Sequence, residues 1–157
     1  MGEEADTGYA PVNDDKTTLV KTGNGANRVN GSLDQPFIDL MRRAKPNQVI
    51  KVATYGLSSS TQEFKELANA ARRGAKLRIV LNKAYSSSTV AALGNLVTTE
   101  GLDIEVRIPG KTMHEKFGVL DDDTFNGSAN LSASSTYKHS EDRFVFKNNA
   151  GLAAKFD

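Results

Sequence analysis

The feature that most limits the possible folds is a repeated pairing of a short apolar run with a stretch of helical spacing. Val49–Ala53 and Leu77–Leu81 are short and almost continuously apolar, as expected of strands that are covered on both faces. After each run, apolar residues recur every three or four positions, which predicts a helix. The two runs start 28 residues apart, about the length of one strand–loop–helix unit. The sequence therefore predicts parallel strands connected by helices.

Other segments extend this pattern into a complete domain. The helix after the first run is expected to begin with a capping box made by Ser60 and Glu63 and to end before Gly74. Further helices are expected at 34–45, at 88–100 and from Ala150, and further strands at 17–20, 104–108, 114–120, 124–127 and 143–146. This order predicts an α/β domain with a mixed, mostly parallel β-sheet flanked by helices on both faces.

Composition narrows the class of protein. The 157 residues suit one domain, and the lack of cysteine excludes a disulfide framework, a thiolate zinc site and a cysteine nucleophile. No run of 18 apolar residues is present, so no membrane span is expected, and the polar, acidic start does not resemble a signal peptide.

Charge is distributed unevenly along the chain. Residues 1–15 hold five acidic and no basic side chains and lack periodicity, so we interpret them as a flexible acidic tail or linker stub before one domain over 16–157. That domain carries 20 basic and 14 acidic groups, a mild excess that could attract a polyanion but that charge alone explains better as ordinary surface charge. Four arginines are instead expected to lie at helix ends, where the helix dipole favours cations: Arg42, Arg43, Arg72 and Arg73.

The first of the two histidines lies beside a lysine in a predicted strand. Residues two apart in a strand face the same side, so His114 and Lys116 are expected to project together, with Phe117 and Val119 on the opposite face. Gly118 is expected to leave open space beside the pair. A neutral imidazole can attack phosphorus, and an ammonium can neutralise phosphate oxygens. Taken alone, the pair is weak evidence for a site and is better explained as two polar residues on a strand surface.

A second polar segment follows the next predicted strand. Gly127-Ser128-Ala129-Asn130 places a hydroxyl and a carboxamide on a tight turn that a phosphate could approach. Together the two segments form H-x-K-x4-D-x5-G-S-x-N, with Asp121 as its aspartate. This pattern resembles the signature of the phospholipase D superfamily. The Ser-rich stretch 131–135 and the strand that begins at Glu141 make the chain similar to the small bacterial endonucleases of that superfamily over about residues 17–156.

The resemblance implies a role for each matching residue. His114 would attack the phosphodiester and form a phosphohistidine, while Glu141 would orient the imidazole through its other nitrogen. Asp121 belongs to the signature and is grouped with the catalytic residues, but its place in a turn suggests that it supports the loop. The residues implied to bind phosphate oxygens are Lys116, Gly127, Ser128 and Asn130.

The resemblance also bears on assembly and cofactors. The superfamily reaction uses two histidines, and this chain has one copy of the motif, which implies a homodimer with two His114 residues facing each other. A chain that is half of a two-motif protein is the alternative. His139 lacks a lysine two positions later, so it does not supply a second motif. No cofactor is implied, no metal is needed, and the three acids of 121–123 are interpreted as a solvated turn.

Three functions compete at this stage. The favoured one is a metal-independent, sequence-nonspecific endonuclease acting on DNA, or on RNA, with nucleic-acid contacts expected from Lys111, Lys138, His139 and Arg143. The second is a phospholipase D, which usually needs an apolar rim that the loops do not show. The third is a catalytically inactive nucleic-acid-binding module.

No stable membrane association is expected, and the sequence does not indicate whether an inhibitor or immunity protein binds this chain. A periplasmic or secreted location is favoured over a cytoplasmic one.

Overall fold

The computed structural model describes residues 17–21, 35–83, 87–127, 131, 142–146 and 150–156. Its elements are β1 (Thr17–Lys21), α2 (Gln35–Arg43), β2 (Val49–Thr54), α3 (Gln62–Arg72), β3 (Lys76–Leu81), α4 (Ser87–Glu100), β4 (Ile104–Arg107), β5 (Lys116–Leu120), β6 (Asp123–Gly127), β7 (Asp142–Phe146) and α6 (Ala150–Phe156). Every helix and strand expected from the sequence is present, with ends that coincide or differ by at most two residues. The tail expected over residues 1–15 lies outside the described ranges.

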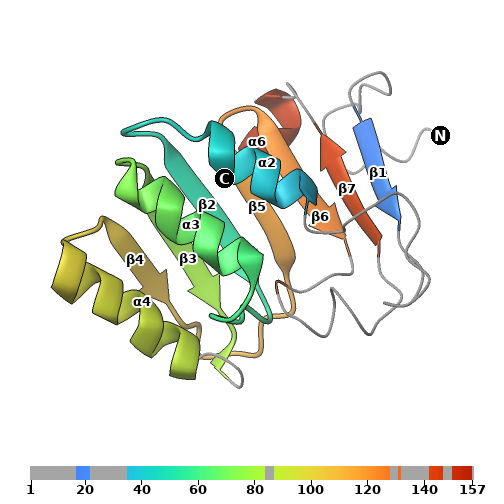
Figure 1. Cartoon of the computed structure of the whole chain (residues 1–157). Coiled ribbons are helices and arrows are strands. Elements are labelled where there is room, and N and C mark those ends of the chain that lie inside the picture. Colours follow the sequence, from blue (N-terminus) through green and yellow to red (C-terminus); the bar gives the residue numbers. More distant parts are fainter. Residues whose placement is uncertain are drawn as a thin grey trace.

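The described strands form one mixed sheet in the order β1-β7-β6-β5-β2-β3-β4 (Figure 1). Only β2–β3 and β3–β4 pair in parallel, and the other four pairings are antiparallel. The mixed sheet is thus as predicted, but the expectation of mostly parallel pairing needs correction. β1, β2, β3, β4 and β6 do run in one direction, yet β5 and β7 alternate with them and make most neighbours antiparallel. A two-residue turn joins β5 to β6, and so short a connection permits only an antiparallel pair.

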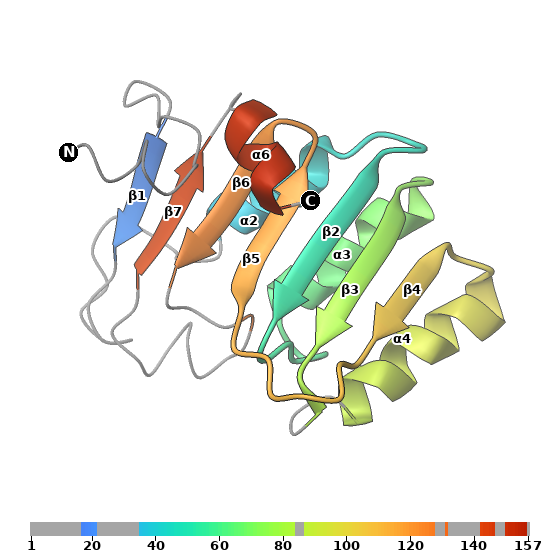
Figure 2. The same cartoon turned by 180° about the vertical axis from the view of Figure 1, so that it is seen from behind.

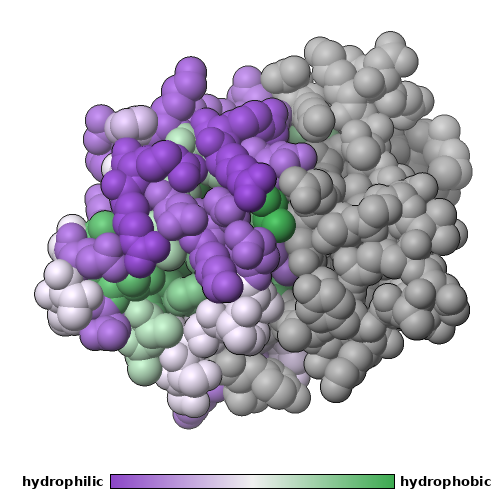
Figure 3. Space-filling view, viewed as in Figure 1, coloured by the Kyte–Doolittle hydropathy of each residue, from purple (hydrophilic) through white to green (hydrophobic). Residues whose placement is uncertain are grey.

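Helices cover both faces of the sheet, as predicted. α2, α3 and α4 lie on one face, and α6 lies on the other, against β5 and β6 (Figures 1 and 2). Hydrophilic side chains gather over α2 and α3, and apolar ones gather around α4 (Figure 3). Among the described helices, none is long and apolar enough to span a membrane.

The core lies between the sheet and the layer formed by α2, α3 and α4. Phe37 and Met41 of α2 are fully buried, as are Ile50 of β2 and Leu77 of β3. Phe37 meets Phe125 of β6 edge to face, with ring centroids 5.0 Å apart. This packing fixes the positions of β2 and β6, the two neighbours of β5, and the motif residues lie on or next to β5 and β6.

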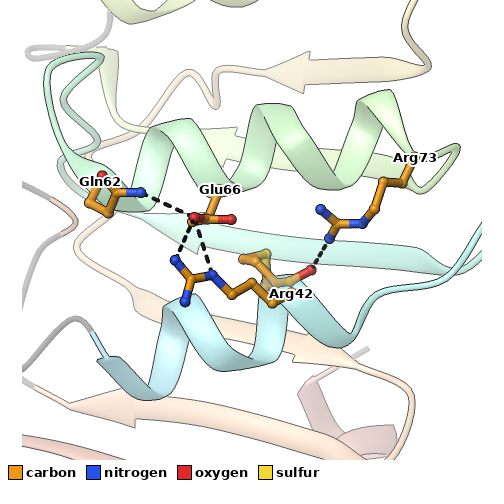
Figure 4. A network of polar contacts seen from close by, with 5 residues as sticks. Arg42, Gln62, Glu66 and Arg73 are labelled. Carbon is orange, nitrogen blue, oxygen red and sulfur yellow. Dashed lines mark hydrogen bonds and ion pairs between the residues drawn. The ribbon is translucent and has the colours of Figure 1, made fainter.

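Polar contacts join α2 to α3 (Figure 4). Arg42 donates to the Glu66 carboxylate at 3.1 Å, and Gln62 donates to the same oxygen at 3.1 Å. Arg73 donates to the main-chain carbonyl of Met41 at 2.5 Å. The four arginines expected at helix ends do lie there, and these contacts show that the arginines also connect elements.

The start of α3 differs from the expected capping box. Thr61, rather than Ser60, is the N-cap, and its hydroxyl accepts a hydrogen bond from the Phe64 backbone N–H at 3.2 Å. With Thr61 as the N-cap, the buried Glu63 is the second residue after the cap, whereas a capping box needs a glutamate at the third. Thr61 is itself buried, and its hydroxyl donates to the carbonyl of Ser58, which anchors the loop before the helix. Tertiary packing therefore selects the cap one residue later than the local pattern suggests.

Candidate active site

The candidate site lies at the edge of the sheet where β2 and β6 end and β5 begins. Thr54, the last residue of β2, is paired with Lys116, the first residue of β5. Beyond the strands, the Tyr55 backbone N–H donates to the carbonyl of Glu115 at 2.8 Å. The two strands are therefore still joined at the position next to His114. In open α/β sheets, ligands commonly bind outside the carboxyl ends of the strands.

His114 and Lys116 are in direct contact. Lys116 Nζ lies 3.0 Å from His114 Nδ1 and 3.3 Å from Nε2, and it donates to the His114 carbonyl oxygen at 3.0 Å. The proximity expected from the sequence is thus confirmed. Its cause differs, because β5 begins at Lys116 and His114 precedes the strand. The imidazole is exposed and the lysine is half-buried, so the imidazole is open to a substrate.

Tyr55 is a neighbour of the pair that the sequence analysis missed. Its ring centroid lies 4.6 Å from that of His114 with the planes tilted by 58°, and Lys116 Nζ lies 5.6 Å from the Tyr55 ring centroid. One feature of the sequence could have indicated this neighbour. Tyr55 directly follows a buried strand, so it lies at the carboxyl end of β2.

Buried polar groups hold the segment that carries His114. Asn82, which is 4% exposed at the end of β3, accepts a hydrogen bond from the Met113 backbone N–H at 3.0 Å. This bond fixes the residue immediately before His114. The motif histidine is therefore placed from both sides, by Asn82 before it and by β5 after it.

Gly118 does not leave open space beside the pair, contrary to the expectation. A Cβ atom at Gly118 would overlap the ring of Phe125, which is buried on the neighbouring strand β6. Glycine is needed there because the Phe125 ring covers the backbone of β5. Phe117 and Val119 lie on the opposite face of β5 from Lys116, as the strand alternation predicted.

Asp121 does not belong with His114, which corrects its grouping with the catalytic residues. It lies in the β5–β6 turn, at the far end of a five-residue strand, roughly 16 Å from Lys116 at strand spacing. Its backbone is left-handed, with φ of 51°, and its carboxylate accepts a hydrogen bond from Gln48. Asp121 thus shapes the turn, as its place in the motif had suggested.

The Gly-Ser-x-Asn segment is described only at its two ends. Gly127 ends β6 and is paired with Arg143 of β7. Leu131 forms a parallel bridge with Leu57, and its backbone N–H donates to the carbonyl of Gly56 at 2.9 Å. The segment therefore starts and ends at the sheet edge that carries His114. Five of the expected site residues lie outside the described ranges: Ser128, Asn130, Lys138, His139 and Glu141.

The remaining expected contact is Lys111, which is exposed in the segment that leads to His114. Among the described residues, no group of three or more His, Asp or Glu side chains could hold a metal ion. The described site does provide an imidazole with an ammonium beside it, a pair of groups that is suited to chemistry on an anionic ester.

The fold and site together define an α/β domain with a histidine–lysine pair at a sheet edge. A comparison with protein families identifies the family to which such a domain belongs. A family model described as a phospholipase D-like domain of cardiolipin synthase matches residues 37–157. The chain therefore belongs to the phospholipase D-like superfamily of phosphodiester-acting enzymes. Among curated protein sequences, none matches this chain.

Solved structures share the fold at low sequence identity. Nuc from Salmonella typhimurium, a phospholipase D family member, is 21% identical with a TM-score of 0.69, over 89% of this chain and 88% of that one. NucT from Helicobacter pylori is 19% identical with a TM-score of 0.64, over 90% and 91%. Phosphatidylserine synthase from Haemophilus influenzae is 15% identical with a TM-score of 0.69, over 89% of this chain and only 36% of that one.

Proposed function

We propose that the protein is an endonuclease that cleaves the phosphodiester backbone of nucleic acid, with His114 as the nucleophile. The observation that carries the proposal is the contact between the exposed imidazole of His114 and the ammonium of Lys116, 3.0 Å from Nδ1, at the edge of the sheet. An imidazole beside a fixed positive charge is suited to attack an anionic phosphate, because the cation offsets the repulsion between the lone pair and the phosphate oxygens.

The reaction would proceed in two displacements. The unprotonated ring nitrogen of His114 attacks phosphorus, a P–N bond forms, and the P–O bond to the leaving oxygen breaks. A second histidine donates a proton to that oxygen and then removes a proton from water. The water oxygen attacks the phosphohistidine, the P–N bond breaks, and the imidazole is restored with a phosphate monoester as product. Lys116 neutralises the non-bridging oxygens throughout, so no metal ion is required in this scheme.

Other motif residues complete the proposed site. Gly127, Ser128 and Asn130 bind the phosphate oxygens together with Lys116, and Glu141 orients the His114 imidazole. Gly127 and Leu131 support this part of the proposal, because they put both ends of the segment at the edge that carries His114.

The second histidine comes, in this proposal, from a second copy of the chain. Each chain carries one motif, so a homodimer with the two His114 residues facing each other supplies the nucleophile and the acid. The exposure of His114 supports this arrangement, because an imidazole at an open edge can be approached by a partner.

Nucleic acid is the proposed substrate because of charge. Residues 16–157 carry a basic excess, and Lys111 is exposed three residues before His114, where it can contact a phosphate next to the scissile one. Lys138, His139 and Arg143 are proposed to extend this contact. A phospholipid is the second candidate, favoured by the likeness to a phosphatidylserine synthase.

One experiment separates these functions. The protein is incubated in EDTA with supercoiled plasmid and, separately, with phosphatidylcholine vesicles, beside His114→Ala and the charge control Lys65→Ala on α3. Plasmid nicking that persists in EDTA, disappears in His114→Ala and survives in Lys65→Ala supports the proposal. Choline release without nicking overturns it in favour of a phospholipase D. Binding of DNA without cleavage favours an inactive binding module, and nicking abolished by EDTA contradicts metal independence.

A further inference from the structure

Tyr55 occupies a position that the motif does not account for. It follows β2 directly, and its half-buried ring faces both members of the histidine–lysine pair. The ring centroid lies 4.6 Å from the imidazole of His114 and 5.6 Å from Lys116 Nζ. One aromatic ring therefore contacts the nucleophile and its cation at the same time.

The backbone that carries Tyr55 is fixed on both sides. Its N–H donates to the carbonyl of Glu115, the residue between His114 and Lys116. The next carbonyl, that of Gly56, accepts from the hydroxyl of Thr54 at 2.9 Å and from the N–H of Leu131 at 2.9 Å. Thr54 is only 1% exposed. The ring is thus presented from rigid backbone at the end of a central strand.

The backbone of Tyr55 is fixed, whereas the side chains of His114 and Lys116 have conformational freedom that contact with the ring can restrict. His114 is exposed and lies outside a strand, and a lysine side chain has more rotatable bonds than almost any other. The face of an aromatic ring attracts a cation and packs against an imidazole, so it restricts both groups. A nucleophile held in one orientation before the substrate arrives reacts faster than one that must be ordered during the reaction.

We infer that Tyr55 is a positioning residue: its ring holds the His114 imidazole and the Lys116 ammonium in a single arrangement ready for a phosphodiester. Because the contacts with His114 and Lys116 are made by the ring, phenylalanine is expected to preserve this role and leucine is not. The inference rests on the proposed function for its effect on rate, but the ordering of His114 can be measured without any substrate.

The test compares Tyr55→Phe, Tyr55→Leu and the control Phe117→Leu, which removes an aromatic ring from the opposite face of β5. Three-bond couplings measured by NMR report the χ1 rotamer of His114, and His139→Ala assigns the signals because the chain has two histidines. Steady-state hydrolysis of bis(p-nitrophenyl) phosphate gives kcat and KM without assuming nucleic acid or lipid, and a thermal melt checks folding.

In the folded wild type, Tyr55→Phe and Phe117→Leu proteins, we expect one His114 rotamer. In Tyr55→Leu we expect averaged couplings and a kcat lower by about 10- to 100-fold with KM nearly unchanged, the size of effect that misplacement of a reacting group produces. A single rotamer in Tyr55→Leu, or a kcat equal to that of the wild type, overturns the inference. Full activity in His114→Ala would instead contradict the proposed function, in which His114 is the nucleophile. The rotamer measurement would still decide whether Tyr55 orders the imidazole.

Discussion

At the scale of single residues, the proposed mechanism depends on the Lys116 cation next to the His114 imidazole. Lys116 reaches both ring nitrogens of His114 and the carbonyl of the same residue, so its ammonium stays beside the imidazole. A charge that is already in place costs no reorganisation when the phosphate becomes more negative in the transition state. Lys111, in contrast, is exposed three residues before His114, and we expect it to contribute to binding of the proposed substrate and not to the chemical step.

This difference predicts distinct kinetic effects for two lysines. Lys116→Met is expected to lower kcat on a phosphodiester substrate by about 100- to 1,000-fold, the usual effect of removing one charge-stabilising donor. Lys111→Met is expected to raise KM for DNA and to leave kcat close to that of the wild type. Steady-state kinetics on both variants check this, and a Lys116→Met enzyme with unchanged kcat would contradict the assigned role.

Two glycines give a matched stability prediction. Gly118→Ala places a Cβ against the buried Phe125 ring, so the ring or β5 must move, and the protein is expected to lose about 1–3 kcal/mol. Gly94→Ala, in the middle of α4 with no atom within 4 Å of the new Cβ, is expected to gain about 0.5–1 kcal/mol. Urea unfolding of both variants measures the difference. Equal stabilities would show that Phe125 does not restrict this position.

At the scale of elements, the sequence predicted the presence of helices and strands better than their ends. Short apolar runs made β2 and β3 predictable, and the spacing of apolar residues made α4 predictable, each within one or two residues. The cap of α3 moved from Ser60 to Thr61, which is buried, and burial depends on tertiary packing that no local pattern contains. Tyr55 was missed for the same reason, since its partners come from a strand that lies far away in the sequence.

A pH-dependent contact joins the ends of α3 and α4. Arg72 donates to both carboxylate oxygens of Glu100, at 2.8 and 2.9 Å. This hydrogen bonding lowers the pKa of Glu100 below its usual 4.5, against a smaller opposing effect of desolvation, and raises that of Arg72. A carboxyl group with a lowered pKa in the folded state stabilises the fold above its unfolded pKa, and this contribution is lost as the pH falls through the lowered value.

Glu100→Gln should therefore lower Tm slightly at neutral pH, because the pair is exposed to solvent and screened. The difference in Tm between wild type and variant should disappear once the pH is below the lowered pKa of Glu100. Thermal melts over a pH series, repeated with Arg72→Met, test this. A difference that persists or grows in acid would show that the carboxylate does not stabilise the fold.

At the scale of the whole molecule, the order of strands could not be obtained from the sequence. β5 inserts between β2 and β6, and β1 pairs with β7 near the other end of the chain. Such pairings depend on contacts between distant segments, whereas the sequence pattern reports only local structure. The same topology explains the site, because it brings the end of β2, the start of β5 and Leu131 to one edge. It also separates Asp121 from the histidine that shares its motif.

The proposed dimer has a kinetic consequence that can be measured by mixing. If each active site needs His114 from both copies, a dimer with one His114→Ala chain is inactive. Reassembly of wild-type and variant chains at a series of ratios should then give activity that falls with the square of the wild-type fraction. Refolded mixtures and a plasmid-nicking assay check this, and a linear dependence would show that one histidine per site is sufficient.

The central claim is that His114 attacks phosphorus, and trapping the covalent intermediate tests it most directly. Enzyme mixed with labelled DNA in EDTA is quenched within the first turnovers and analysed by peptide mass spectrometry under conditions that preserve phosphohistidine. We expect an acid-labile nucleotide adduct on His114 that is absent from His114→Ala and retained in Lys65→Ala. DNA cleavage with no adduct, or with an adduct on another residue, would contradict it.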